Sequence, residues 1–334
     1  MAVTAFTEVP AVDLTPFRTG SPAARRATAH EVGEALEHVG FLSIVGHGVD
    51  PSLFPSMVGA AQEFFALPVE QKALSTRLVG GDPGWYPLAS STLAQSLDLG
   101  SPPDLKEAFG VAPIDRPPPD VLVDPYAARW FPENRWPEEP VGFTEVWVRW
   151  YRAMEELSAT LLEAFAVALD LPDGYFAQHT GHHTSTASMI SYPALRQPPE
   201  PGQLRAGGHT DYGTLTILHK AGAGAGLQVV NRDGDWIDVR HQPLGFIVNI
   251  GDLMARWTND RWVSTMHRVV NPTDAGEPDR GELSFPYFHQ PDHDCTVAAL
   301  PTCVDADHPA RYEPIRAGDH LASKVDKMHA PAAS

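Results

Sequence analysis

The feature that most constrains the fold is a series of short β-type segments that follows residue 181. Runs rich in aliphatic, aromatic and threonine residues alternate there with turns that contain glycine, proline, asparagine and aspartate. They lie at 188–192, 214–218, 227–230, 236–239, 246–250, 267–270, 283–288 and 296–300. Strands that recur every roughly 8 to 15 residues without intervening helices predict a sandwich or barrel rather than alternating β-α units.

The N-terminal half predicts helices beside these strands. Short strands are expected at 9–14 and 41–45, and Ser21-Pro22 begins a helix because a cap residue precedes a proline. Apolar residues at helical spacing predict a long helix over 143–169 whose aromatic stripe packs in the core. The proline- and glycine-rich range 80–140 predicts sparse regular structure at the surface. The fold class is therefore expected to be mainly β with flanking helices.

The charge balance disfavours two classes of partner. With 24 Lys and Arg against 42 Asp and Glu, the formal net charge is −18. Nucleic acid and anionic membrane surfaces are therefore expected to be repelled.

No export signal begins the chain, and acidic residues interrupt its longest apolar stretch. The two cysteines, Cys295 and Cys303, are too few for a disulfide framework. These features predict a soluble, cytoplasmic protein.

Three residues could form a metal site. His209 and Asp211 are two positions apart, which places both side chains on the same face of an extended strand end. His267 lies in a later β-type run, where closure of a barrel can bring it opposite the first pair. Two imidazoles and one carboxylate on one face of a metal leave the opposite face open, as in non-haem Fe(II) oxygenases. A His-x-Asp pair alone arises often by chance, so its context carries more weight.

The context is a set of motifs in a fixed order. They are HTDYGTLT at 209–216, GLQV at 226–229, VNIGD at 248–252, WTN at 257–259 and STMHRV at 264–269. Together they resemble the isopenicillin N synthase-like family of Fe(II)- and 2-oxoglutarate-dependent oxygenases. Segments 9–14, 40–48 and 67–72 are similar to the N-terminal region of that family, so the resemblance extends over nearly the whole chain.

The resemblance implies a double-stranded β-helix, or jelly roll, as the core of one compact unit. Its parts are expected to be an N-terminal helical and strand region at 1–110, a proline-rich loop with a long support helix at 111–180, the catalytic core at 181–305 and a closing segment at 306–334. Matched by position, His209, Asp211 and His267 correspond to the metal ligands of the family. Open coordination positions favour Fe(II), although the ligand set by itself does not exclude zinc or manganese.

The cosubstrate site departs from the family pattern. The family holds the distal carboxylate of 2-oxoglutarate with an Arg-x-Ser pair on a late strand, and here Ser284 matches but Glu282 stands in place of the arginine. A glutamate there would repel a dicarboxylate. Tyr192 and Ser284 remain the matched cosubstrate contacts, and Arg280 and Arg205 are two candidates to replace the arginine. If Arg280 does so, Arg280→Ala is expected to weaken cosubstrate binding by about 1.5 to 3 kcal/mol.

The resemblance implies a dioxygenase, an oxidoreductase that oxidises a small-molecule substrate with O2 and 2-oxoglutarate and releases succinate and CO2. Glu282 keeps an alternative open: an Fe(II)-dependent oxidase of the isopenicillin N synthase type that takes its electrons from the substrate and does not use 2-oxoglutarate. A binding protein without turnover is disfavoured, because such a protein would be expected to have lost a metal ligand. Neither the substrate nor the oligomeric state is specified by the residues.

Two smaller expectations concern polar residues near these motifs. Asn249 is expected either to point toward the metal or substrate or to stabilise a turn. Four histidines outside the metal pattern, His219, His241, His289 and His293, are expected at the surface or at strand ends.

Overall fold

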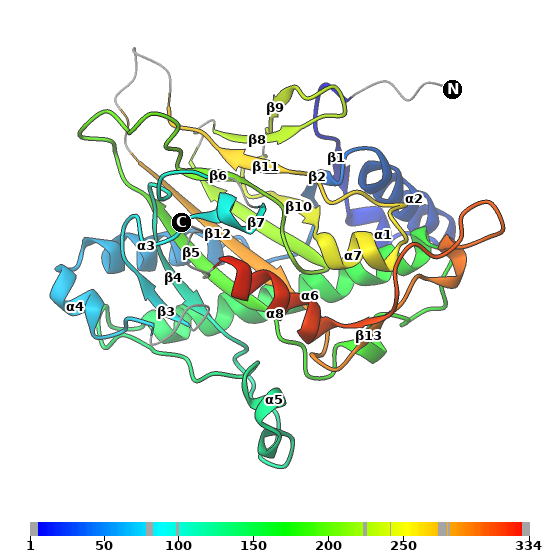
Figure 1. Cartoon of the computed structure of the whole chain (residues 1–334), viewed down its shortest axis with the longest axis horizontal. Coiled ribbons are helices and arrows are strands. Elements are labelled where there is room, and N and C mark those ends of the chain that lie inside the picture. The colour runs from blue at the N-terminus through cyan, green and yellow to red at the C-terminus, as the bar shows by residue number, and fades with distance from the viewer. Residues whose placement is uncertain are drawn as a thin grey trace.

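The computed structural model describes residues 6–77, 83–97, 100–222, 226–240, 242–272, 279 and 281–328. Two β-sheets lie face to face, and helices cover the outer face of the larger sheet (Figure 1). The larger sheet has the strand order β1-β2-β10-β7-β12-β5-β4-β3, and the smaller sheet has the order β6-β11-β8-β9. From β5 to β12, consecutive strands lie in opposite sheets except for β8 and β9, which is the connectivity typical of a jelly roll.

The strands of the larger sheet are β1 (Ala11–Asp13), β2 (Phe41–Val45), β3 (Gly84–Tyr86), β4 (Glu107–Val111), β5 (Thr186–Tyr192), β7 (Leu215–Ala221), β10 (Phe246–Ile250) and β12 (Glu282–His289). Those of the smaller sheet are β6 (Ala206–His209), β8 (Leu227–Val230), β9 (Trp236–Asp238) and β11 (His267–Val269). A separate pair joins β13 (Thr296–Val297) to β14 (Ile315–Arg316).

The helices are α1 (Thr15–Thr19), α2 (Pro22–His38), α3 (Leu53–Ala66), α4 (Val69–Ala73), α5 (Pro125–Ala128), α6 (Phe143–Ala168), α7 (Asp252–Trp257) and α8 (Ala317–Met328). Short 3-10 turns are η1 (Leu93–Leu97), η2 (Val121–Val123), η3 (Ala177–His179) and η4 (Pro301–Cys303). At the start of α2 the Ser21 side chain accepts a hydrogen bond from the Ala24 amide and Pro22 occupies the first turn, as predicted. No described helix combines the length and the apolarity that crossing a bilayer demands.

Side-chain alternation along the larger sheet creates two apolar cores. The outer core lies between this sheet and helices α3 and α6, where Trp147 and Trp150 of α6 are fully buried. The inner core lies between the two sheets and includes Phe41, Val229 and Ile247. Helices cover one face of the larger sheet and the smaller sheet covers the other. Side chains on both faces of the larger sheet are therefore shielded from water. The predicted class, mainly β with flanking helices and a jelly-roll core, is confirmed.

Two local predictions differ from the structure. The range 80–140 contains β3 and β4, which extend the larger sheet beyond β5, and Phe109 of β4 is buried. The boundary expected between residues 110 and 111 falls inside β4. Strand β6 is absent from the predicted series of β-type runs because its sequence, Ala-Gly-Gly-His, has low β propensity. Its glycines allow close packing instead, since a Cβ on Gly207 would lie 3.0 Å from the Cβ of Ala94.

Candidate metal and cosubstrate site

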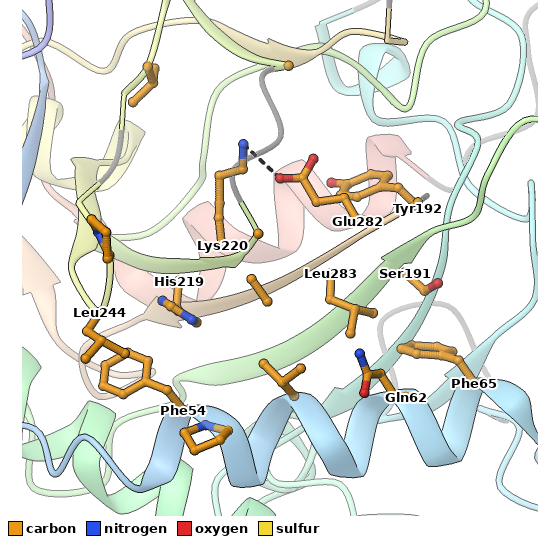
Figure 2. A pocket seen from close by; sticks show the side chains of 18 of the residues that line it. Phe54, Gln62, Phe65, Ser191, Tyr192, His219, Lys220, Leu244, Glu282 and Leu283 are labelled. Carbon is orange, nitrogen blue, oxygen red and sulfur yellow. Dashed lines mark ion pairs between the residues drawn. The ribbon is translucent and has the colours of Figure 1, made fainter. Parts of the chain in front are cut away.

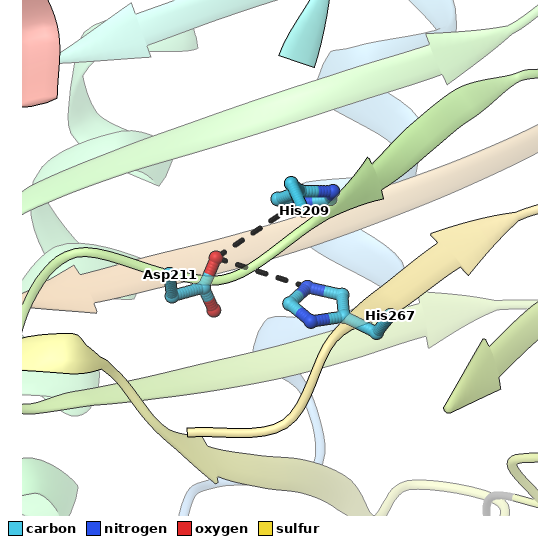
Figure 3. A group of neighbouring side chains, drawn as sticks. All are labelled: His209, Asp211 and His267. Atoms are coloured by element: carbon cyan, nitrogen blue, oxygen red, sulfur yellow. Dashed lines mark ion pairs between the residues drawn. The ribbon is translucent and has the colours of Figure 1, made fainter. Parts of the chain in front are cut away.

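The predicted metal residues converge between the two sheets. Antiparallel pairing of β6 with β11 places His209 directly opposite His267, and Asp211 follows β6 by two residues. Figure 3 shows the three side chains pointing toward one another. The Asp211 Oδ1 atom lies 3.9 Å from His209 Nε2 and 3.8 Å from His267 Nε2. One nitrogen or oxygen from each side chain lies within 4.8 Å of the others, a spacing that a single ion can bridge.

Backbone carbonyls fix the orientation of both imidazoles. His209 Nδ1 lies 2.8 Å from the Gly207 carbonyl oxygen, and His267 Nδ1 lies 3.2 Å from that of Thr265. A carbonyl oxygen can only accept, so each Nδ1 carries a proton and donates it to that carbonyl. Each Nε2 is therefore the nitrogen directed at Asp211, which is the arrangement that metal-ligating histidines adopt.

Two polar side chains from the larger sheet hold Asp211. Its Oδ2 atom accepts hydrogen bonds from Thr216 Oγ1 at 2.6 Å and from Asn249 Nδ2 at 2.7 Å. These bonds occupy Oδ2 and leave Oδ1 directed at the histidines. Of the two roles considered for Asn249, the structure thus shows the one on the metal side.

Electrostatics favours the protonation states that ligands need. Burial, and then the neighbouring His267, lower the pKa of His209 to about 4, so this imidazole is neutral at pH 7. Burial alone would raise the pKa of Asp211, but His267, His209 and the bonds from Asn249 and Thr216 outweigh it and lower the pKa. A neutral imidazole and an ionised carboxylate are the forms that bind a divalent cation.

The donor set fits a divalent transition metal with open coordination positions. Nitrogen and carboxylate donors without thiolate suit Fe(II), and three protein ligands on one side leave the other side free for cosubstrate and O2. The three side chains are nearly buried, with 7 to 12% of each exposed. A carboxylate buried beside two imidazoles needs a compensating positive charge, which such an ion supplies.

We expect Asn249→Ala and Thr216→Val each to lower iron affinity by about 10- to 100-fold, because each removes a hydrogen bond that orients Asp211. Equilibrium competition with a colorimetric Fe(II) chelator measures this affinity. Asn231→Ala is the matched control, since Asn231 is also a buried asparagine but holds the turn between β8 and β9. Equal iron affinity in all three variants and the wild type would contradict the role assigned to Asn249 and Thr216.

The predicted cosubstrate residues lie on neighbouring strands of the larger sheet. Tyr192 of β5 and Ser284 of β12 are both buried, and β12 pairs with β5 so that Glu282 is opposite Tyr192. Burial raises the pKa of the Tyr192 hydroxyl well above its ordinary value, and contact with Ser284 opposes this shift. Tyr192 therefore stays protonated and able to donate a hydrogen bond.

Glu282 has a partner that the sequence did not reveal. Lys220 of β7 places its Nζ atom 2.9 Å from Glu282 Oε1, and both side chains are 4% exposed (Figure 2). Arg205, one of the two expected substitutes for the family arginine, lies 3.9 Å from Glu282 Oε2 and pairs with Asp279 at 2.8 Å. Arg280, the other one, lies outside the described residues.

The expectation for the remaining histidines is partly wrong. His219, His289 and His293 are buried, with 3 to 7% exposure, although His289 does end strand β12. The ring of His219 packs edge-on against Phe54 at 4.6 Å and stacks near Phe285, so it is part of the apolar core. His241 lies outside the described residues. The number of histidines alone could not distinguish those packed in the core from those that bind metal. The pairing of β6 with β11 makes this distinction, because it brings His209 and His267 together.

Two family models match most of the chain. Residues 9–139 match the model of the N-terminal region of non-haem dioxygenases in morphine synthesis, and residues 181–291 match the 2OG-Fe(II) oxygenase superfamily. The second range contains Asp211, His267 and His209 as well as Tyr192 and Ser284.

Whole-chain relatives lead to the same family. The chain is 33% identical to the validamycin A dioxygenase of Streptomyces hygroscopicus subsp. limoneus, over 96% of this chain and 86% of that protein. It is also 33% identical to the 2-oxoglutarate-Fe(II) type oxidoreductase hxnY of Emericella nidulans, over 98% and 92%. Neurospora crassa T7H in complex with alpha-KG superposes with a TM-score of 0.84 at 27% identity, over 95% and 96% of the two chains. These likenesses favour the 2-oxoglutarate-using enzyme over the alternative oxidase. The chain belongs to the 2-oxoglutarate- and Fe(II)-dependent oxygenase superfamily.

Proposed function

We propose that His209, Asp211 and His267 hold the Fe(II) ion of a dioxygenase that oxidises a small organic substrate. The observation that carries this proposal is the convergence of the three ligand atoms, with each Nδ1 held by a carbonyl and Oδ2 of Asp211 held by two donors. When bound, the iron with 2-oxoglutarate and O2 supplies the oxidation of a substrate C–H bond, and succinate and CO2 are the by-products.

The residues of the chain position these reactants. The hydroxyls of Tyr192 and Ser284 are proposed to donate hydrogen bonds to the distal carboxylate of 2-oxoglutarate, because both are buried and lie on the neighbouring strands β5 and β12 of the larger sheet. Side chains between the sheets, including Phe41 and Val229, exclude water from the interior. Exclusion of water protects reactive species from side reactions and strengthens each polar contact.

The partners of this enzyme are proposed to be small molecules. An excess of acidic residues disfavours binding to nucleic acid or to anionic lipid. We also propose that the protein works in the cytoplasm, since Cys295 and Cys303 are both free thiols and Cys295 is buried.

An anaerobic titration tests the proposed function. The wild-type protein with Fe(II) is expected to develop a weak visible charge-transfer band when 2-oxoglutarate is added, because a 2-oxo acid chelates iron through its keto acid end. After oxygen is admitted, succinate should appear, with about one succinate released per substrate oxidised once a substrate is found.

Ser284→Ala and Tyr192→Phe are expected to raise the 2-oxoglutarate concentration needed for the band, each by about 5- to 10-fold, the worth of one hydrogen bond. Absence of both the band and succinate would refute the cosubstrate assignment.

A further inference from the structure

Lys220 and Glu282 form a buried ion pair on the inner face of the larger sheet. Lys220 has the same strand parity as Thr216, whose side chain bonds Asp211, so both point between the sheets. In the register of β7 with β12, Lys220 lies directly opposite Ser284. The ammonium group is therefore a cross-strand neighbour of a predicted cosubstrate contact.

This ion pair leaves the carboxylate incompletely satisfied. The contact between Lys220 and Glu282 is a 2.9 Å ion pair rather than an aligned hydrogen bond, and neither oxygen of Glu282 accepts a hydrogen bond among the described residues. Buried polar side-chain atoms normally have at least one hydrogen-bond partner. Both side chains line a cavity of about 1190 Å³ that also reaches Tyr192. Room for a further polar group therefore adjoins the pair.

Another buried lysine–glutamate pair of the same chain provides the contrast. Lys72 of α4 contacts Glu107 of β4 at 2.8 Å. There Glu107 Oε2 accepts hydrogen bonds from Lys72 Nζ at 2.8 Å and from Trp85 Nε1 at 3.1 Å. The carboxylate of Glu107 is thus satisfied by the protein itself, as expected in a purely structural ion pair.

We propose that Lys220 supplies the cation that the family pattern places at position 282, and that it binds the distal carboxylate of 2-oxoglutarate beside Ser284 and Tyr192. This inference rests on the proposed function. An ammonium group has three donors and no fixed plane, so one lysine can contact Glu282 and a ligand carboxylate together. Glu282 then positions Lys220 before the cosubstrate arrives.

Arg205 is less suited to this role. Its Nη2 atom is paired with Asp279 at 2.8 Å, and that carboxylate is held in turn by the backbone amides of Leu195 and Gly281. Releasing Arg205 to bind a ligand carboxylate would break this network. Arg205 instead offsets the negative charge of Glu282 from 3.9 Å, which lowers the repulsion of an incoming carboxylate.

The test compares two ligands that differ only in the distal carboxylate. Anaerobic calorimetry with Fe(II) measures binding of 2-oxoglutarate and of 2-oxopentanoate to the wild type, Lys220→Met and the matched control Lys72→Met. We expect Lys220→Met to weaken 2-oxoglutarate binding by about 10- to 150-fold, the range for a hydrogen bond to a charged group. Binding of 2-oxopentanoate should stay within about threefold, and Lys72→Met should change neither affinity by more than that. Lys220→Arg, which keeps the charge, should recover most of the loss.

Two results would overturn the assignment of Lys220. One is unchanged 2-oxoglutarate affinity in Lys220→Met, and the other is an equal loss for both ligands, which indicates general disruption. Since Lys220→Met leaves Glu282 buried without its cation, Lys220→Met/Glu282→Gln is the second variant, and it should also lose most of the preference for 2-oxoglutarate. Failure of the wild type to bind 2-oxoglutarate would instead refute the proposed function, so the two failures are distinguishable.

Discussion

Replacing His209, Asp211 or His267 by alanine is expected to abolish iron-dependent turnover. Each substitution removes one of three protein ligands, and Asp211→Ala also removes the negative charge that compensates the ion. Loss of activity should exceed the roughly 10- to 100-fold effect of removing a partner that only orients a ligand. Oxygen-dependent succinate formation and iron content per protein are the two measurements.

The fold is expected to survive these substitutions, because the three side chains belong to the site and lie outside both apolar cores. Circular dichroism and the thermal midpoint check this point. His308→Ala is the control and should retain full activity, since His308 is an exposed histidine that pairs with Asp305 in a surface turn. A ligand variant with wild-type turnover and unchanged iron content would remove that residue from the metal site.

Trp150→Ala is expected to lower the free energy of unfolding by about 3 to 5 kcal/mol, the usual cost of truncating a buried aromatic residue. The Trp150 ring is fully buried and contacts rings from four elements, among them Phe54 of α3, with ring centroids 5.7 Å apart, and Phe285 of β12, with ring centroids 5.8 Å apart. Its loss leaves a cavity where α6 joins the larger sheet. Urea unfolding followed by circular dichroism measures the change.

Two control variants show whether the loss of stability comes from the buried ring. Trp150→Phe keeps an aromatic ring in the same space and should cost less than the alanine variant. Glu156→Ala changes an exposed position of the same helix and should stay within about 0.5 kcal/mol of the wild type. If Trp150→Ala and Glu156→Ala were equally stable, α6 would not anchor the larger sheet through this ring.

Much of the fold could be predicted because local patterns and packing agree. The cap at Ser21 and Pro22 begins α2, and the apolar stripe over 143–169 becomes the buried face of α6. Strand β6 and the extension of the sheet by β4 could not be predicted in the same way. Glycine-rich and proline-rich segments carry weak strand signals, and what makes them strands is pairing with β11 and β5.

The metal residues were identifiable because their spacing and surrounding motifs are local in sequence. The cosubstrate residues could be identified from the sequence only in part. Tyr192 and Ser284 match the family pattern by position. Whether Glu282 repels a dicarboxylate depends on which cationic side chain of a neighbouring strand neutralises it. Arg280 and Arg205 were chosen for nearness in sequence, whereas the register of β7 with β12 brings Lys220 to Glu282 from 62 positions away.

By itself, the sequence determined the class of fold, the two histidines and one aspartate of the candidate metal site, and the negative net charge. These features follow from the spacing of hydrophobic residues, from the chemistry of single side chains and from the total composition. Each of them can be evaluated from a short segment or as a sum over the chain, without knowledge of the tertiary structure. Only the tertiary structure decided which nitrogen of each imidazole faces Asp211, that Asn249 holds this carboxylate, and that Lys220 neutralises Glu282. The physical reason is that hydrogen bonds and buried ion pairs depend on distances of 3 to 4 Å between strands, and strand register sets those distances.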